Sequence, residues 1–308
     1  MNNSKLGETI EQAGINYGFD SCGIIPINFM DSFETNLKKR VEAVPSTASF
    51  YSYTPAKDKF PWGASIVICT YNFGKYRYPK ELRGRYGKAF LLGPEKGKPY
   101  GYDIAGFEDW FESQGIRCHQ GGFGSMRHAA EKAGLGIVRK NNFFYTESGS
   151  YVELVGFVID QECELIHNNS LTPCSDKCDL CQRACKSNSL CASHTMNPFQ
   201  CISFWTTFGK GNVPPGLTED MYEQWICGCD NCQDACPHNR KHNWDEGEAY
   251  SDLEEIAPLL VPEKIITATD EFLKEQVISR TSDHLQPEDS EVLRINARRA
   301  IQNMKQDY

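Results

Sequence analysis

The chain has 308 residues, a formal net charge of −9, and a composition with 40% hydrophobic and 12% aromatic residues. The length suits one large domain or two ordinary ones, and the hydrophobic content is enough for a substantial core. The acidic balance argues against a surface built throughout to bind phosphate backbones. No apolar run is as long as a membrane span and the N-terminus does not resemble a secretion signal, so we expect a cytoplasmic enzyme.

The N-terminal half has the pattern of a mixed α/β domain. Apolar spacing predicts a helix over residues 4–17, and the run SCGIIP at 21–26 predicts a short buried strand. The β-branched run SIVICTY at 65–71 predicts the clearest strand of the chain. A second helix is expected at 102–114 and a closing strand at 151–160.

A basic segment rich in tyrosine, KYRYPKELRGRYGK, follows the second predicted strand at residues 75–88. Basic residues interleaved with aromatic ones can hold a nucleic-acid backbone and stack a base. A solvated loop is the more common explanation of such a run. Both interpretations stay open at this point.

A glycine-rich run, GGFGSMR at residues 121–127, leads into the helical pattern HAAEKAGLG. Glycines in such a place let the backbone approach a flat or anionic ligand at a helix N-terminus. The spacing differs from the dinucleotide motif G-x-G-x-x-G, and no clear strand precedes it. We therefore do not expect a nicotinamide site.

Ten of the fourteen cysteines lie between residues 174 and 236, in the runs CSDKCDLCQRAC and CDNCQDACP. In two-cluster bacterial ferredoxins the fourth cysteine of such a run ligates the other cluster. The spacing therefore predicts two 4Fe–4S clusters. The first cluster would be held by Cys174, Cys178, Cys181 and Cys236, and the second by Cys185, Cys229, Cys232 and one further thiolate.

Cys201 and Cys227 are the candidates for that last ligand. Cys227 stands only two residues before Cys229, an awkward spacing for two corners of one cubane, so we favour Cys201. Zinc sites use separated Cys pairs, and disulfides need an oxidising compartment, so both fit less well. The first gap of three residues and the Lys186 that follows Cys185 depart slightly from the ferredoxin pattern.

We expect three regions: an α/β cofactor and substrate domain at 1–165, a double-cluster ferredoxin-like domain at 166–245, and a helical C-terminal segment at 246–308. Two or three helices are expected between 263 and 304. The four cysteines outside the cluster region are expected to be small core residues. They are Cys22, Cys69, Cys118 and Cys163.

Several motifs in order along the chain resemble the epoxyqueuosine reductase family, which is related to reductive dehalogenases. They are AEKAGLG followed by Lys140-Asn141-Asn142, the two cysteine runs, CISFWTT, and LRINARRAIQN. The resemblance supports Cys201 as the eighth ligand, because the family has a cysteine followed by Ile-Ser at that place.

The resemblance implies a cobalamin-dependent iron–sulfur reductase. Electrons from an external low-potential donor, a ferredoxin or flavodoxin, would pass through the clusters to the corrinoid cobalt, which carries the difficult chemistry. The residues expected to hold the cofactor are Gly122, Gly124, Ser125, Arg127, Gly134, Gly136, Lys140 and Asn141.

Two departures from the family bear on the substrate and the proton donor. The family's Asp-Ser-Ala-Pro segment is missing, and Gln120 stands where its proton-donating aspartate is expected. His119, Tyr102 and Asp103 are the replacement candidates. In addition, many family members continue beyond LRINARRAIQN into a helical region that helps to hold tRNA.

These departures lead us to expect a small organic substrate in preference to tRNA. Two alternatives stay open. One is a tRNA epoxyqueuosine reductase that uses segment 75–88 to hold RNA. The other is a non-catalytic two-cluster electron carrier, which is disfavoured because a carrier does not need a large N-terminal domain.

Overall fold

The computed structural model describes residues 3–48, 54–92, 101–281 and 284–306. The chain divides into two compact units. The first comprises Met1–Asn72 and Gly101–Asp176, and the second comprises Phe73–Tyr100 and Lys177–Tyr308. The second unit thus includes the basic segment, which the sequence-based division had placed in the first domain, together with the C-terminal helices.

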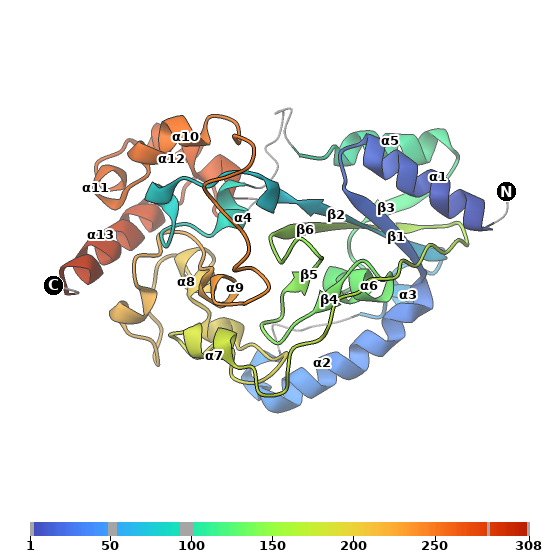
Figure 1. Ribbon diagram of the computed structural model, residues 1–308, viewed down its shortest axis with the longest axis horizontal. Helices are drawn as coiled ribbons and strands as arrows, with labels where there is room; N and C mark the ends of the chain where they lie inside the picture. Colours follow the sequence, from blue (N-terminus) through green and yellow to red (C-terminus); the bar gives the residue numbers. More distant parts are fainter. Residues whose placement is uncertain (1–2, 49–53, 93–100, 282–283, 307–308) are drawn as a thin grey trace. The chain divides into compact units, whose positions relative to one another are not determined.

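The first unit is built on a four-stranded antiparallel sheet (Figure 1). Its order is β1 (Ser21–Pro26), β2 (Ser65–Asn72), β6 (Val152–Ile159) and β3 (Cys118–Gln120). The three strands predicted from apolar runs are confirmed. The expectation that no strand precedes the glycine-rich run is wrong, because β3 ends at Gln120; with three residues and little apolar character, β3 leaves no sequence pattern.

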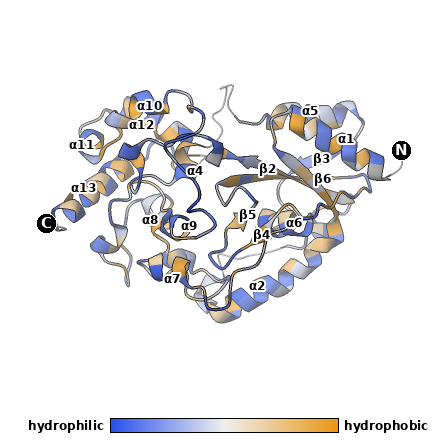
Figure 2. Cartoon of the chain, in the orientation of Figure 1, coloured by the Kyte–Doolittle hydropathy of each residue, from blue (hydrophilic) through white to orange (hydrophobic). Residues whose placement is uncertain are grey.

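Helices cover both faces of this sheet (Figure 1). The helices are α1 (Asn3–Asn16) and α5 (Ile104–Ser113) on one side, and α2 (Asp31–Ala43), α3 (Ala56–Lys59) and α6 (Met126–Lys132) on the other. Alternate residues of a strand face opposite sides. Accordingly Val158 belongs to the core beneath α6, whereas Phe157 packs against Phe107 and Phe111 of α5. Figure 2 shows β2 and β6 as predominantly hydrophobic.

A two-stranded sheet, β4 (Ile137–Val138) and β5 (Phe144–Tyr145), follows α6. Gly134 and Gly136 lie in the turn between α6 and β4. Gly134 has a φ of +74°, and a Cβ there would lie 1.8 Å from the carbonyl oxygen of His167. A Cβ on Gly136 would lie 2.1 Å from the Tyr145 carbonyl oxygen. Both glycines are therefore required by the close approach of the chain to itself.

The second unit consists of short helices joined by loops. They are α4 (Lys88–Leu91), α7 (Leu180–Ala184), α8 (Ile202–Thr206), α9 (Asn231–Asp234), α10 (Leu253–Ile256), α11 (Pro262–Ile265), α12 (Asp270–Gln276) and α13 (Ser290–Gln306). The helices predicted between residues 263 and 304 are thereby confirmed as α11, α12 and α13. No helix in the described ranges is both long enough and apolar enough to span a membrane.

Three buried polar residues of the LRINARRAIQN motif connect α13 to the loops that carry cysteines. The amide of Asn296 donates to the carbonyl oxygens of Thr206 and Ile226 at 2.9 and 2.8 Å. Arg299 donates to the Gly211 carbonyl oxygen, and Asn303 donates to the carbonyl oxygen of Glu223. The motif therefore supplies hydrogen-bond donors to backbone carbonyl groups that are buried away from water and would otherwise have none.

We expect Asn296→Ala to lower the midpoint of thermal unfolding by roughly 5–10 °C, because it leaves two buried carbonyl groups without donors. Circular dichroism of the purified protein measures the change. Gln302→Ala, an exposed change on the same helix, is the matched control. Equal midpoints for both variants would contradict a role for Asn296 in holding these loops.

Candidate iron–sulfur centres and proton donor

Four cysteines of the second unit come together around α7, α8 and α9. Cys185 is the C-cap of α7 and Cys201 is the N-cap of α8, while Cys229 and Cys232 flank the start of α9. Helices α7 and α9 pack against each other. These local structures bring four thiols, from three separate stretches of the sequence, into one region of the second unit.

The electrostatic influence of these thiols on one another indicates that they lie close together. Burial raises the pKa of Cys232, and the proximity of Cys201 and Cys185 raises it further. Burial likewise raises the pKa of Cys229, with Cys201 and Cys232 adding to it. Four thiolates close to one another repel, so they need a cationic centre, and a bound metal deprotonates its thiol ligands. This donor set therefore fits a 4Fe–4S cluster.

Hydrogen-bond donors already point at the sulfur of Cys201. The backbone N–H groups of Phe204 and Ser203 and the hydroxyl of Ser189 lower the pKa of Cys201, although burial raises it overall. The Cys185 sulfur lies 3.7 Å from the Ser187 hydroxyl oxygen. Hydrogen bonds to ligand sulfurs are a usual feature of iron–sulfur sites and help to set their reduction potential.

Cys227 is placed differently. It is fully buried, and burial alone raises the pKa of its thiol. Its backbone pairs with Tyr86, and its thiol contributes to the raised pKa values of Tyr78 and Tyr86. This environment of tyrosines favours Cys201 over Cys227 as the eighth ligand.

The other four predicted ligands are divided between the units. Cys178, Cys181 and Cys236 belong to the second unit and Cys174 to the first. Cys181 adds to the raised pKa of Cys232, so it also lies near α9. Cys174 accepts a long hydrogen bond, 3.9 Å, from the guanidinium of Arg139. Within the described ranges, no three His, Cys, Asp or Glu side chains are close enough to hold a single metal ion.

The cations of segment 75–88 are engaged within the second unit. Ion pairs join Arg77 to Glu254, Arg83 and Lys80 to Asp245, and Lys88 to Asp230 and Asp234. The tyrosines of the segment, Tyr76, Tyr78 and Tyr86, are at most 4% exposed. Buried rings cannot stack on a base, so these tyrosines do not form a stacking surface for RNA.

The residues expected to hold a corrinoid are taken up by contacts inside the first unit. Ser125 caps α6, and Arg127 donates to the Asn142 carbonyl oxygen. Lys140 donates to the carbonyl oxygens of Ser175 and Asp176, and the buried Asn141 donates to the Tyr145 hydroxyl. Gly122 and Gly124 have φ values of +76° and +106° in the loop before α6. The polar groups of Ser125, Arg127, Lys140 and Asn141 therefore bond to the chain itself.

The three candidate proton donors are not brought together. His119 is exposed on β3, opposite Val158 of β6, with its ring 5.0 Å from that of Phe60. Asp103 is the N-cap of α5 and accepts a hydrogen bond from the Gly106 N–H at 2.9 Å. Its carboxylate therefore has a structural task at the helix end.

Of the three candidates, Tyr102 is the one that contacts another ionisable side chain inside the first unit. Its ring stacks on Phe19 at 4.7 Å and meets Tyr71 edge-on at 5.3 Å. It also forms a side-chain hydrogen bond with Glu153 of β6, the residue paired with Tyr71 across the sheet. Glu153 lies five residues along β6 from the partner of His119, about 17 Å away.

Glu153 was missed by the sequence analysis. Burial raises the pKa of its carboxyl group, and the hydrogen bond with Tyr102 offsets part of that rise. A carboxyl group that keeps its proton at higher pH is suited to general acid catalysis. The available signal was a single ionisable residue in the apolar run VELVGFVI.

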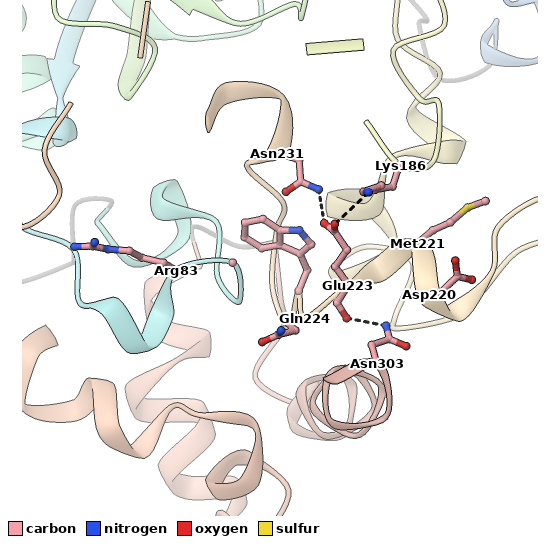
Figure 3. A pocket seen from close by; sticks show the side chains of 10 residues that line it. Arg83, Lys186, Asp220, Met221, Glu223, Gln224, Asn231 and Asn303 are labelled. Carbon is pink, nitrogen blue, oxygen red and sulfur yellow. Dashed lines mark hydrogen bonds and ion pairs between the residues drawn. The ribbon is translucent and has the colours of Figure 1, made fainter. Parts of the chain in front are cut away.

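A polar pocket of about 550 Å³ opens in the second unit beside the loops of the second predicted cluster (Figure 3). Glu223, at a φ of +49°, is held there by Asn231 and Asn303. Lys186, which follows Cys185, and Asn231, between Cys229 and Cys232, both line it. The wall of the pocket therefore lies one or two residues along the chain from three predicted ligands, Cys185, Cys229 and Cys232.

No family model matches the chain. An epoxyqueuosine reductase from Cyclobacterium marinum is 27% identical over 82% of this chain and 86% of its own length. Another from Staphylococcus aureus is 34% identical over 45% of this chain and 36% of its own. The structure of a selenomethionine-labelled epoxyqueuosine reductase superposes with a TM-score of 0.76 at 26% identity, covering 98% of this chain and 82% of that one. The order of motifs, the fold and these similarities agree, and together they confirm the resemblance to epoxyqueuosine reductases along most of the chain.

Proposed function

We propose that the protein is a tRNA epoxyqueuosine reductase, which removes the epoxide oxygen of epoxyqueuosine by a two-electron reduction with uptake of protons. The observation that carries this proposal is the similarity to epoxyqueuosine reductases along 82% of the chain. The N-terminal unit would hold the cofactor and the modified nucleoside, and the cysteine-bearing unit would be the two-cluster electron-transfer domain.

The expectation of a small organic substrate is wrong. Relatives matched over most of the chain are named epoxyqueuosine reductases, and a solved relative of the same fold, with a TM-score of 0.74, was crystallised with an epoxyqueuosine-modified tRNA stem loop. That expectation rested on the loss of the family aspartate at Gln120 and on the helical region that many family members carry beyond the LRINARRAIQN motif. Glu153 offers another carboxyl group for the proton.

The eight predicted cluster ligands are Cys174, Cys178, Cys181, Cys185, Cys201, Cys229, Cys232 and Cys236. Support for the second cluster comes from the convergence of its four thiols. Electrons would enter from an external low-potential donor, and the pocket beside Lys186 is a candidate surface for that contact.

Cobalamin is proposed from the family resemblance. When bound, it supplies a low-valent cobalt that delivers electrons to carbon. The residues expected to hold it make hydrogen bonds within the first unit. This chain's own residues would supply the proton. Glu153 would hold it, and Tyr102 would orient the carboxyl group.

The test is conversion of epoxyqueuosine to queuosine in tRNA by the anaerobically purified protein, supplied with iron, sulfide, cobalamin and a chemical reductant. Nucleosides released from the tRNA are separated and weighed by mass spectrometry. We expect queuosine to form with the wild-type protein and not with Cys232→Ala, which removes a cluster ligand. Protein that carries both clusters and cobalamin but leaves epoxyqueuosine intact would contradict the proposal.

A further inference from the structure

A buried lysine reaches the loop between two ligands of the second predicted cluster. Lys88, the first residue of α4, is 3% exposed. Its ammonium lies 3.2 Å from a carboxylate oxygen of Asp230 and 2.8 Å from one of Asp234, and its backbone N–H donates to Asp230 at 2.8 Å. Asp230 stands between Cys229 and Cys232, and all of these residues belong to the second unit. Lys88 therefore holds the ligand loop by both its side chain and its backbone.

The residues just before Lys88 hold the same stretch of chain through its backbone. The N–H group of Ile226 donates to the Arg85 carbonyl oxygen at 2.7 Å. The N–H group of Gly87 donates to the Cys227 carbonyl oxygen at 2.8 Å. The chain is thus held immediately before the pair of cysteine ligands as well as between them.

The surroundings of Lys88 keep its side chain charged and away from water. Its ammonium lies 5.0 Å from the centre of the Trp244 ring and 5.9 Å from that of the Tyr78 ring. Burial lowers the pKa of Lys88, but Asp230 and Asp234 raise it by more, so the ammonium stays charged at neutral pH. A charge acts more strongly on its neighbours where water is excluded.

Two other groups that can carry a positive charge count for less. Lys186 follows Cys185, but its side chain is 58% exposed, so water and salt screen its charge. Burial lowers the pKa of His242, and the charge of Lys88 lowers it further, so the ring stays neutral at neutral pH. Neither group competes with the ammonium of Lys88, which is buried and paired directly with the ligand loop.

We propose that Lys88 is a positioning residue for the second predicted cluster, acting through Asp230 to hold the ligand loop and raising the reduction potential of the cluster. The inference rests on the cluster assignment in the proposed function. Burial raises the pKa of the Cys229 and Cys232 thiols, and the charge of Asp230 raises it further, so charge at this carboxylate acts on both ligands.

Reduction transfers one electron from the external donor to the cluster, which gains one negative charge while no bond breaks. A buried cation stabilises that added charge, because local charge and hydrogen bonds set cluster potentials. Loss of Lys88 would remove the cation and leave the carboxylates of Asp230 and Asp234 without this partner. Both effects oppose reduction of the second cluster.

The test is the midpoint potential of the second cluster in Lys88→Met. Paramagnetic resonance spectra, recorded while dithionite reduces the reconstituted protein, give the midpoints, and the signal that Cys201→Ser loses identifies the second cluster. At a fixed potential we expect the ratio of reduced to oxidised second cluster to fall about tenfold, which is about 59 mV for a one-electron couple. An unchanged midpoint overturns the inference.

Two further variants separate charge from a general disturbance of the fold. Lys80→Met removes the same charge from the same segment at a side chain that is 75% exposed, and should leave the midpoint unchanged. Asp230→Asn should raise the midpoint, because it removes a negative charge beside two ligands and keeps an oxygen for the Lys88 N–H. Shifts in the same direction for Lys88→Met and Asp230→Asn would contradict a role for charge.

If Lys88→Met does not retain the second cluster, Lys88→Arg decides, since it keeps the charge. Retention of the cluster at the wild-type midpoint supports the inference, and loss of the cluster overturns it. The potentials are measured without tRNA, so failure to reduce epoxyqueuosine would refute the proposed function and leave this result standing. If Cys201→Ser removes no signal from the wild-type spectrum, the cluster assignment is wrong and the inference falls with it.

Discussion

Cys201→Ser should lose about half of the iron of the reconstituted protein, roughly four of eight atoms per chain. The reason is that Cys201 lies near the other three thiols of the second predicted cluster and receives hydrogen bonds at the N-terminus of α8. Iron and sulfide analysis, together with the visible absorption of the clusters, measures the loss. The first cluster should keep its resonance signal.

Cys227→Ser is the matched control, because it makes the same chemical change at the competing cysteine. Cys227 lies in a buried environment with Tyr78 and Tyr86, and we expect the variant to keep its full iron content. A loss of iron in Cys227→Ser, with Cys201→Ser unchanged, would reverse the ligand assignment.

Glu153→Gln should lower kcat for epoxyqueuosine reduction by about 10²–10⁴-fold, the usual contribution of a positioned general acid. Glutamine keeps the shape of the side chain but has no acidic proton. The assay is the release of queuosine from tRNA under saturating reductant. Glu162→Gln, an exposed change just beyond β6, should leave the rate unchanged.

The pH dependence of the same reaction gives a second readout. Because burial raises the pKa of Glu153, its protonated form persists above the ordinary range of a glutamate, and the rate should fall as the pH rises through that pKa. Tyr102→Phe should move this fall to higher pH, since the hydrogen bond with Tyr102 lowers the pKa. Glu153→Gln should lose the pH-dependent fall.

The raised pKa of Glu153 also makes the stability of the folded protein depend on pH. The neutral carboxyl group is favoured in the folded state, so its contribution to stability is present at low pH and is lost as the pH rises through the raised pKa. An unchanged rate in Glu153→Gln, together with a slow His119→Ala variant, would show that His119 is the proton donor instead.

The amino-acid sequence by itself determined the strong local patterns. Apolar runs predicted β1, β2 and β6, because strands buried on both faces consist of consecutive apolar residues. Cysteine spacing predicted the ligand set and, with the order of motifs, the family. Such features can be predicted from the sequence because each depends on residues that are close together along the chain.

Only the tertiary structure decided which distant residues share a site. Tyr102 and Glu153 are 51 positions apart, and it is the packing of the start of α5 beside β6 that joins them. The same holds for segment 75–88: its composition suggested a surface for RNA, yet folding buries its tyrosines and pairs Lys88 with carboxylates between cluster ligands. Charge and burial are properties of neighbours in space, and composition alone does not specify them.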